Sequence, residues 1–234
     1  MDTTPTSPIS PLSEAWHRTA GTRLAGFFLM LLTLFPVITA LYDLMTQKTN
    51  PTPPFWHFVL DLFLFIISTL VTQAMARLGL ARSAGENYST GQLFTLNQKT
   101  FSIILGRLIN YLLALLGTFF ILCLCFLIMF FIGKLIGSIL LIILALPLLI
   151  CSATTDAFIA LAIQNGDAKF YNAWLVALKK AKTYHIRTIG YVILTLLSSM
   201  VGFFCALIGL MWALPFNANL LTIVYLGQKE PLNS

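Results

Sequence analysis

His57 and Asp61, two ionisable side chains four residues apart, are the pair in this sequence best placed to do chemistry. Residues i and i+4 share one face of a helix, so the imidazole and the carboxylate would lie side by side. Asp61 lies about 9 Å inside the apolar run that begins near Phe55. Such a pair is suited to relay a proton or to bind a cation, because ionisable groups inside a membrane are often functional. The alternative is a hydrated, structural pair at the headgroup boundary.

Two amides, Asn110 and Asn217, lie within other apolar runs. We expect Asn110 to make an interhelical hydrogen bond, worth about 0.6–2 kcal/mol in a membrane. Asn217 follows Pro215, and a proline inside a helix frees a carbonyl group that a polar side chain or a water molecule can satisfy. Broken helices with polar residues at mid-depth also mark transporter sites, so both interpretations of Asn217 stay open.

Asp156 also falls in an apolar run, but its position along the helix argues against catalysis. Counted from Lys134, it lies about 33 Å along the helix axis, which places it near the cytoplasmic boundary. There we expect a role at the helix end, or an ion pair with Arg107 or Arg187.

No motif of an enzyme or of a metal site accompanies these residues. The sequence contains no phosphate loop, no Gly-x-Ser-x-Gly and no His-Glu-x-x-His. The three histidines are scattered, and the four cysteines lie inside apolar runs without the spacing of a zinc or redox site. We therefore predict no catalytic residue, no metal, no cofactor and no enzymatic activity.

The elements that must position these side chains are membrane helices. Apolar residues make up 58% of the chain and charged residues 9%, and the mean hydropathy is +0.88. The stretch from Leu108 to Ile132 carries no charge, and about 20 apolar residues in a helix suffice to span a bilayer. The runs are continuously apolar rather than alternating, which excludes a β-barrel. The predicted fold is an all-α, polytopic transmembrane helical bundle.

We predict a membrane domain over residues 13–228, between a flexible cytoplasmic tail (1–12) and a second cytoplasmic tail (229–234). Six apolar runs, arranged as three hairpins, form the predicted spans, at about 24–44, 55–75, 104–131, 135–161, 186–204 and 208–226. Six crossings put both termini on one side of the membrane. Of the 14 Lys and Arg residues, only Lys48 and Lys134 fall on the opposite side. The positive-inside rule therefore makes both termini cytoplasmic.

Amphipathic helices are expected on the cytoplasmic side, a short one over residues 13–23 and a longer one before the fifth span. In the longer one, apolar side chains recur every three or four residues and share one face: Phe170, Ala173, Trp174, Ala177, Leu178, Ala181 and Tyr184. Lys179 lies opposite this face, and Lys180 and Lys182 flank it. Together with Asp156, Arg107 and Trp174, these lysines form the predicted cytoplasmic interface. An apolar face ringed by Lys suits the headgroup region, and packing on the ends of the spans is the alternative.

Short motifs along the chain follow the pattern of a protein family. They are Gly85-Glu86, Leu93-Phe94, Pro147, Gly166-Asp167, Asn172-Ala173-Trp174, Pro215 and Tyr225. In these motifs and in hydropathy, residues 13–227 resemble small bacterial six-span inner-membrane proteins of unknown function. These are similar in pattern to the membrane domain attached to some glycerophosphodiester phosphodiesterases. The chain departs from the pattern at Ala177, where similar proteins often have Ser. The resemblance implies an architecture and a bacterial inner membrane, and it implies no activity.

These observations favour an integral inner-membrane protein without enzymatic chemistry, acting as an accessory, scaffold or lipid-interacting subunit. Its expected partners are anionic headgroups on the cytoplasmic side and other membrane proteins or a second copy of the chain. The net charge of +6 reflects membrane topology, so no nucleic-acid partner is expected. The alternative is a small-solute or proton-coupled transporter that uses Asp61, His57 and the kinked span around Asn217. That function would require a polar cavity reaching the middle of the membrane.

Overall fold

The computed structural model describes residues 11–46, 54–86, 90–183, 185–204 and 209–227. The helices are α1 (Pro11–Thr19), α2 (Arg23–Thr46), α3 (Pro54–Ser83), α4 (Thr90–Leu93), α5 (Gln98–Phe131), α6 (Lys134–Asn165), α7 (Phe170–Thr183), α8 (His185–Phe204) and α9 (Leu210–Gly227). Every regular element in these ranges is a helix. The predicted all-α class is therefore confirmed for the part of the chain that the structure describes.

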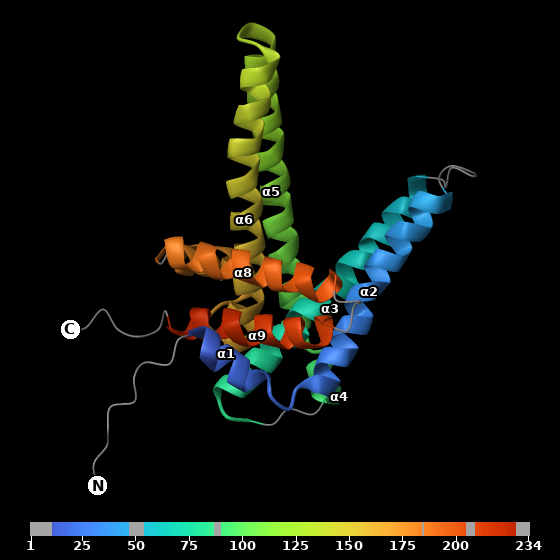
Figure 1. The fold of residues 1–234 in the computed structure, drawn as a ribbon, viewed down its shortest axis with the longest axis vertical. Helices are drawn as coiled ribbons and strands as arrows, with labels where there is room; N and C mark the ends of the chain where they lie inside the picture. Colours follow the sequence, from blue (N-terminus) through green and yellow to red (C-terminus); the bar gives the residue numbers. More distant parts are fainter. Residues whose placement is uncertain (1–10, 47–53, 87–89, 184, 205–208, 228–234) are drawn as a thin grey trace, which may run out of the picture.

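α5 and α6 form a long antiparallel pair that stands out from the rest of the molecule (Figure 1). They contain 34 and 32 residues, so each is about 50 Å long. α5 begins with a capping box: the Asn97 side chain accepts a hydrogen bond from the Thr100 amide, and the Thr100 hydroxyl accepts one from the Asn97 amide. α6 ends at Gly166, whose φ of 82° is a left-handed conformation that favours glycine.

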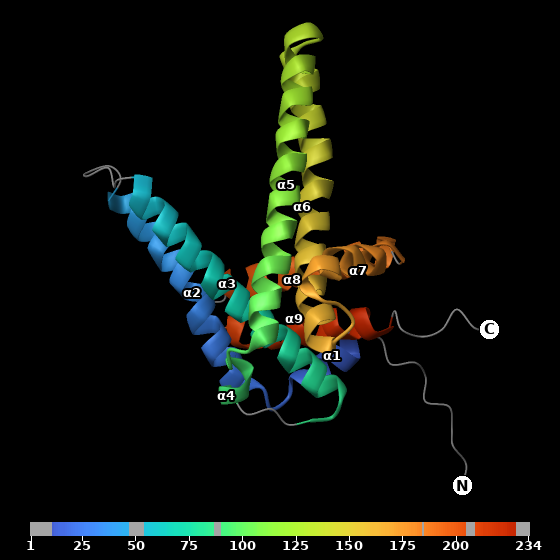
Figure 2. The same ribbon diagram turned by 180° about the vertical axis from the view of Figure 1, so that it is seen from behind.

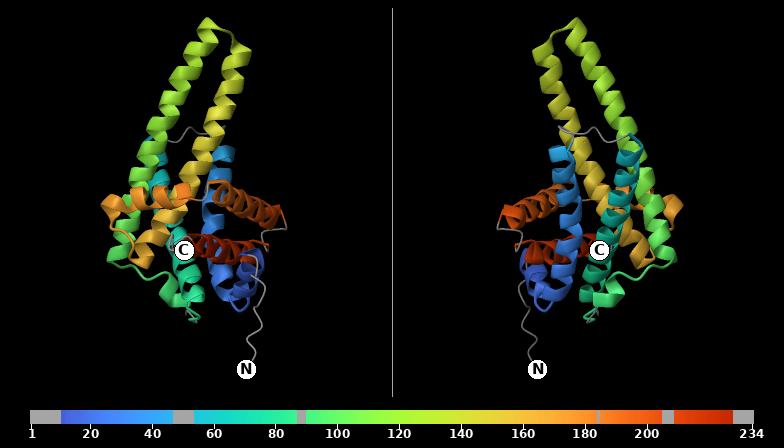
Figure 3. Two further views of the ribbon diagram at one scale, coloured as in Figure 1. Left: turned by 90° about the vertical axis from the view of Figure 1, so that its left-hand side faces the viewer. Right: turned by 90° about the vertical axis from the view of Figure 1, so that its right-hand side faces the viewer.

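α2 and α3 form a second pair, and the two pairs diverge toward their far ends (Figures 1 and 2). Their near ends meet in a base, where the remaining helices gather. α8 and α9 lie in this base, across the direction of α5 and α6 (Figures 1 and 3). The molecule therefore consists of a packed base from which two helix pairs extend.

α9 is the centre of the packing in the base, where it contacts α1, α2, α3, α6 and α8. One buried cluster joins α2, α3, α4 and α9 through residues such as Leu29, Leu78, Leu93 and Leu214. A second cluster joins α3, α5, α6, α7 and α9 around Ile159. Nearly all of the buried core therefore lies in the base, and the far halves of the two pairs present apolar surface.

Each predicted span coincides with a helix, although α3 and α5 extend further into the base than predicted. Within the described residues, three helical stretches are long and apolar enough to cross a membrane: Phe58–Ser83, Gln98–Phe131 and Leu210–Gly227. Six spans in three hairpins are not confirmed. Three further apolar stretches among the described residues, Arg23–Leu34, Lys134–Ala145 and Ile193–Gly202, are shorter than these three. The predicted tails lie mostly outside the described ranges, but α1 already begins at Pro11.

α7 packs against protein rather than presenting its whole apolar face outward. Ala173 and Ala177 are fully buried in the cluster that α5 and α6 share, and Trp174 packs against the same cluster. Phe170 is exposed at the start of the helix, and Tyr184 lies outside the described residues. The structure thus favours the second interpretation of this segment, a helix packed on the ends of its neighbours.

Polar contacts close the junction of α6, α7 and α9. The Tyr225 hydroxyl donates a hydrogen bond to Asp167 Oδ2 at 2.6 Å, and Asn165 Nδ2 donates to the same oxygen at 2.9 Å. Lys180 Nζ lies 3.8 Å from that oxygen and 3.9 Å from the centre of the Tyr225 ring. Because Asp167 lies in the turn after α6, these contacts tie the end of α6 to both α7 and α9.

Candidate functional site

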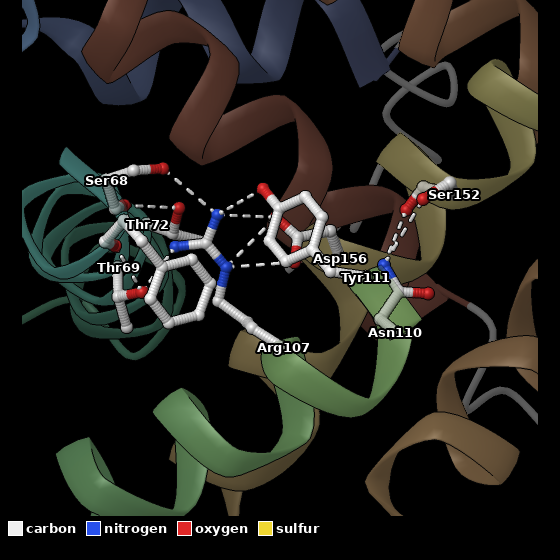
Figure 4. Close-up of polar contacts among 9 residues, drawn as sticks. Ser68, Thr69, Thr72, Arg107, Asn110, Tyr111, Ser152 and Asp156 are labelled. Atoms are coloured by element: carbon white, nitrogen blue, oxygen red, sulfur yellow. Dashed lines mark hydrogen bonds and ion pairs between the residues drawn. The ribbon is translucent and has the colours of Figure 1, made fainter. Parts of the chain in front are cut away.

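Arg107 of α5 and Asp156 of α6 form a buried ion pair where α3, α5 and α6 meet (Figure 4). Arg107 Nη2 lies 2.8 Å from Asp156 Oδ2, and Arg107 Nε donates to Oδ1 and Oδ2 at 2.9 and 3.1 Å. The side chain of Arg107 is 2% exposed and that of Asp156 is 16% exposed. The predicted pairing of these two residues is therefore present, and each charge neutralises the other.

Hydroxyl groups surround the rest of the Arg107 guanidinium. Nη1 donates to Thr69 Oγ1 at 2.9 Å, and Nη2 donates to Ser68 Oγ at 3.1 Å and to Tyr111 Oη at 3.2 Å. The rings of Phe65 and Tyr111 lie 5.7 and 5.8 Å from Arg107 Cζ, within the range of a cation–π contact. We call the following residues the Arg107 cluster: Ser68, Thr69, Arg107, Tyr111 and Asp156.

Helix geometry explains how α3 and α5 supply these groups. Arg107 and Tyr111 are four residues apart, so they lie on one face of α5. The Thr69 hydroxyl donates its own hydrogen to the Phe65 carbonyl at 2.9 Å, which leaves its oxygen free to accept from Arg107. Small hydroxyl residues therefore turn one face of the apolar helix α3 into an acceptor surface for the guanidinium.

Asn110 adds a second polar contact between α5 and α6, close to Arg107 (Figure 4). Its Nδ2 donates to the Ser152 carbonyl at 3.1 Å, and its side chain is almost fully buried. The expected interhelical hydrogen bond of Asn110 is thus present. The ion pair and this bond join specific turns of the two helices, so together they fix the register of α5 against α6.

The Arg107 cluster holds charge and is poorly suited to catalysis. A guanidinium stays protonated, so Arg107 cannot serve as a base, and the Asp156 carboxylate is already engaged by it. A nucleophile activated for catalysis needs a base beside it that is free to take its proton. Among the residues that the structure describes, no three His, Cys, Asp or Glu gather closely enough to hold a metal ion. The direct effect of the cluster is to lock α3, α5 and α6 together.

Two cavities border the Arg107 cluster. One, of about 560 Å³, lies between α2, α3 and α5. Its polar lining residues are Thr33, Asp61, Ser68, Thr72 and Tyr111. The other, of about 140 Å³, lies between α3, α6 and α9, and Asp156 and Thr72 line it. Thr72 lines both cavities, Asp61 lines the larger one and Asp156 the smaller one.

Asp61 lies on α3 as predicted, seven residues before Ser68 and therefore on the same side of the helix. Its side chain is exposed and borders the larger cavity. The side chain of His57 lies outside the described residues. The His57–Asp61 pair therefore stays a prediction, while Asp61 lines the same cavity as Ser68 and Tyr111 of the Arg107 cluster.

The side-chain amide of Asn217 forms its hydrogen bonds with residues of α8. Its Nδ2 donates to the Thr195 carbonyl at 3.0 Å and to Ser199 Oγ at 2.8 Å, and its Oδ1 accepts from Ser198 Oγ at 2.6 Å. α9 continues as a helix through Pro215. Of the two interpretations that the sequence left open for Asn217, the structure favours a structural amide, because α8 supplies its hydrogen-bond partners.

The lysines of the predicted cytoplasmic interface lie on α7 but do not form one surface. Lys179 is exposed, whereas Lys180 is half-buried beside Asp167. The side chain of Lys182 lies outside the described residues. Arg107 and Asp156 lie in the interior instead, so the predicted interface divides into a surface part and a buried part.

Arg77 of α3 is a second buried cation, and its structural role was not predicted from the sequence. Its Nη1 donates to the carbonyls of Gln92, Leu93 and Thr95 at 3.1, 3.1 and 2.7 Å. Gln73 Nε2 donates to the Thr95 carbonyl at 3.2 Å. Both side chains are buried and hold α4 and the loop after it against α3. Their spacing of four residues on one helix face was the available clue.

The resemblance to six-span inner-membrane proteins stays a prediction. Comparisons of the chain with models of protein families, with curated proteins and with solved structures find no match.

Proposed function

We propose that the chain is an integral protein of the bacterial inner membrane that performs no covalent chemistry and serves as an accessory or scaffold subunit of another membrane protein. The exposed apolar surface of α5 and α6 supports this proposal. Phe119, Phe126 and Phe131 are 62, 69 and 77% exposed. An apolar surface of this extent is unfavourable in water, so lipid or a partner has to cover it.

The distribution of charge supports an orientation with the base at the cytoplasmic face of the membrane. The base carries most of the Lys and Arg residues, whereas Lys134 lies at the far turn between α5 and α6. By the positive-inside rule we expect the base, which includes the start of α1 and the end of α9, on the cytoplasmic side. An even number of crossings satisfies this orientation: six as predicted, or four with α8 and α9 remaining across the base.

The divergence of the two helix pairs favours a partner over a bundle that works alone. Membrane helices associate by close packing and by interhelical hydrogen bonds. In this chain those contacts are concentrated in the base, and the far halves of the two pairs diverge (Figure 2). A helix of another protein could pack against these far halves and supply the close helix contacts that they lack within this chain.

Site-specific photocrosslinking in intact cells tests the proposed partner. With a benzoylphenylalanine residue at Phe126 or Phe119, we expect a crosslink to one membrane protein of defined mass. The matched control is Leu96, which is also strongly exposed but lies in the loop before α5. Crosslinks to lipid alone at every position along α5 and α6 would contradict the accessory role.

A proton-coupled or small-solute transporter is the second candidate function. The cavity of about 560 Å³ favours it, because Asp61, Ser68, Thr72 and Tyr111 line this cavity. Intramembrane carboxylates and hydroxyl chains are typical of proton pathways. Asn217, the other residue that the sequence suggested for a transport site, forms its hydrogen bonds with α8 and is not among the residues that line this cavity.

Proteoliposomes loaded with a pH-sensitive dye test this second candidate. If the chain conducts protons through the cavity, Asp61→Asn should reduce the flux at least about tenfold, because the carboxylate that exchanges protons is lost. Lys134→Gln, a change at the far turn, should leave the flux unchanged. A wild-type flux equal to that of empty liposomes would exclude the candidate.

A further inference from the structure

An apolar groove of about 400 Å³ runs between α8 and α9, and α1 borders it. Leu194, Leu197 and Val201 of α8 form one wall, and Phe216 of α9 lies on the other. Leu197 and Val201 are 52 and 61% exposed, so the groove opens to the surface. Its volume lies within the range of about 300–1,000 Å³ that is typical of sites for small ligands.

A second pocket of similar volume, about 400 Å³, adjoins this groove and is more polar than it; we call it the polar pocket. The turn between α1 and α2 forms it, with Thr19, Gly21 and Arg23 among its lining residues. Trp16 and Trp212 line both the groove and the pocket. The two tryptophans therefore mark the boundary between an apolar compartment and a polar one.

The polar pocket is cationic. The guanidinium of Arg23 stacks on Trp212, with Cζ 5.1 Å from the ring centre, and no carboxylate among the described residues pairs with it. The nearest acid on α1, Glu14, is already paired with Arg18. An anion is the ligand that this charge favours.

We propose that the groove and the pocket together bind one anionic phospholipid, with an acyl chain along α8 and α9 and the phosphate at Arg23. This proposal rests on the proposed membrane location. Trp16 and Trp212 then lie at the level of the glycerol backbone, where tryptophan is enriched in membrane proteins. A basic pocket between helices is the kind of site that holds an anionic headgroup. A partner helix would fit the groove but would leave Arg23 without a counterion.

Quenching of Trp212 fluorescence by brominated lipids tests the proposal. The full chain carries Phe in place of Trp16, Trp56 and Trp174, and is titrated in mixed micelles with phosphatidylglycerol or phosphatidylcholine that has dibrominated acyl chains. We expect phosphatidylglycerol to quench at an about fivefold lower concentration than phosphatidylcholine. Arg23→Gln should abolish this preference, and Lys134→Gln should leave it intact. Val201→Phe, which fills the groove, should weaken quenching by both lipids.

The remaining outcomes separate this site from its alternatives. Equal quenching by the two lipids, unchanged in Arg23→Gln, would overturn the proposal. Displacement of the brominated phosphatidylglycerol by inorganic phosphate at equal concentration would show a site for free anions and would also overturn it. Flotation of the protein with vesicles reports membrane insertion separately, so a failure of this site is distinguishable from a failure of the proposed membrane function.

Discussion

Replacing Arg107 with Ala should lower the free energy of unfolding by about 3–5 kcal/mol, because the Asp156 carboxylate then stays buried without its counterion. Arg107 is 2% exposed, and its guanidinium also satisfies Ser68 and Thr69. Asp156→Ala should lower the free energy of unfolding by a similar amount, because the Arg107 guanidinium then stays buried without its counterion. The measurement is chemical or thermal unfolding of the purified protein in mild detergent, followed by circular dichroism.

A double replacement separates the burial of charge from the loss of contacts. Arg107→Leu combined with Asp156→Leu should be less destabilising than the sum of the single changes, since neither charge is left without a partner. Lys99→Ala is the matched control on the same helix. Its Nζ donates to the Gln164 carbonyl at 2.8 Å but is exposed, so the cost should be about 0–1 kcal/mol. Strict additivity of the two Leu changes would show that the pair is not coupled.

Gly26→Ala should cost about 2–3 kcal/mol, although alanine is the better helix former. A Cβ atom at Gly26 would lie 2.0 Å from the Met211 carbonyl oxygen and 3.1 Å from Pro215 Cγ. Pro215 has no N–H, so the Met211 carbonyl lacks its usual helical partner and is free to approach α2 at this crossing. Accommodating the methyl group requires α9 to shift, and α9 is the helix on which the base is packed.

Gly190→Ala provides the control for this prediction. Gly190 lies within α8, and among the described residues no atom outside the nearby helix backbone stands within 4 Å of where its Cβ would be. Alanine there should be neutral or should stabilise the protein by about 0.5–1 kcal/mol. The same unfolding measurement compares the two variants. If both changes have the same sign, the close contact of α2 and α9 at Gly26 does not limit stability.

The helices could be predicted from sequence because length and continuous apolarity are local properties. The ion pair of Arg107 with Asp156 could also be predicted, because a charged side chain in an apolar helix needs a partner of opposite charge, and the apolar helices contain few such side chains. The hydrogen bond between Tyr225 and Asp167 was not, because it joins a side chain in an apolar helix to one in a distant turn. The orientation of α8 and α9 relative to α5 and α6 could not be predicted from the sequence either, because it depends on how the helices pack in the base.

The close approaches at glycines illustrate the same limit. A Cβ atom at Gly79 of α3 would lie 2.6 Å from the Ala218 carbonyl oxygen of α9. The lack of a side chain at Gly79 therefore allows α3 and α9 to approach closely. A small residue on a helix indicates that another backbone can approach, but it does not say which one. The sequence therefore predicts that contacts of this kind exist, and only the fold identifies α9 as the helix that α2 and α3 both approach.

The length of α5 and α6 has a consequence for the kind of membrane that suits the chain. The uncharged stretch from Leu108 to Ile132 is about 37 Å long as a helix, against a hydrocarbon thickness of about 30 Å. If the pair crosses the bilayer as proposed, this mismatch is relieved by tilting it by about 35° or by thickening the surrounding lipid. The angle between the two pairs would then vary with bilayer thickness, and a thinner membrane would make α5 and α6 lean further.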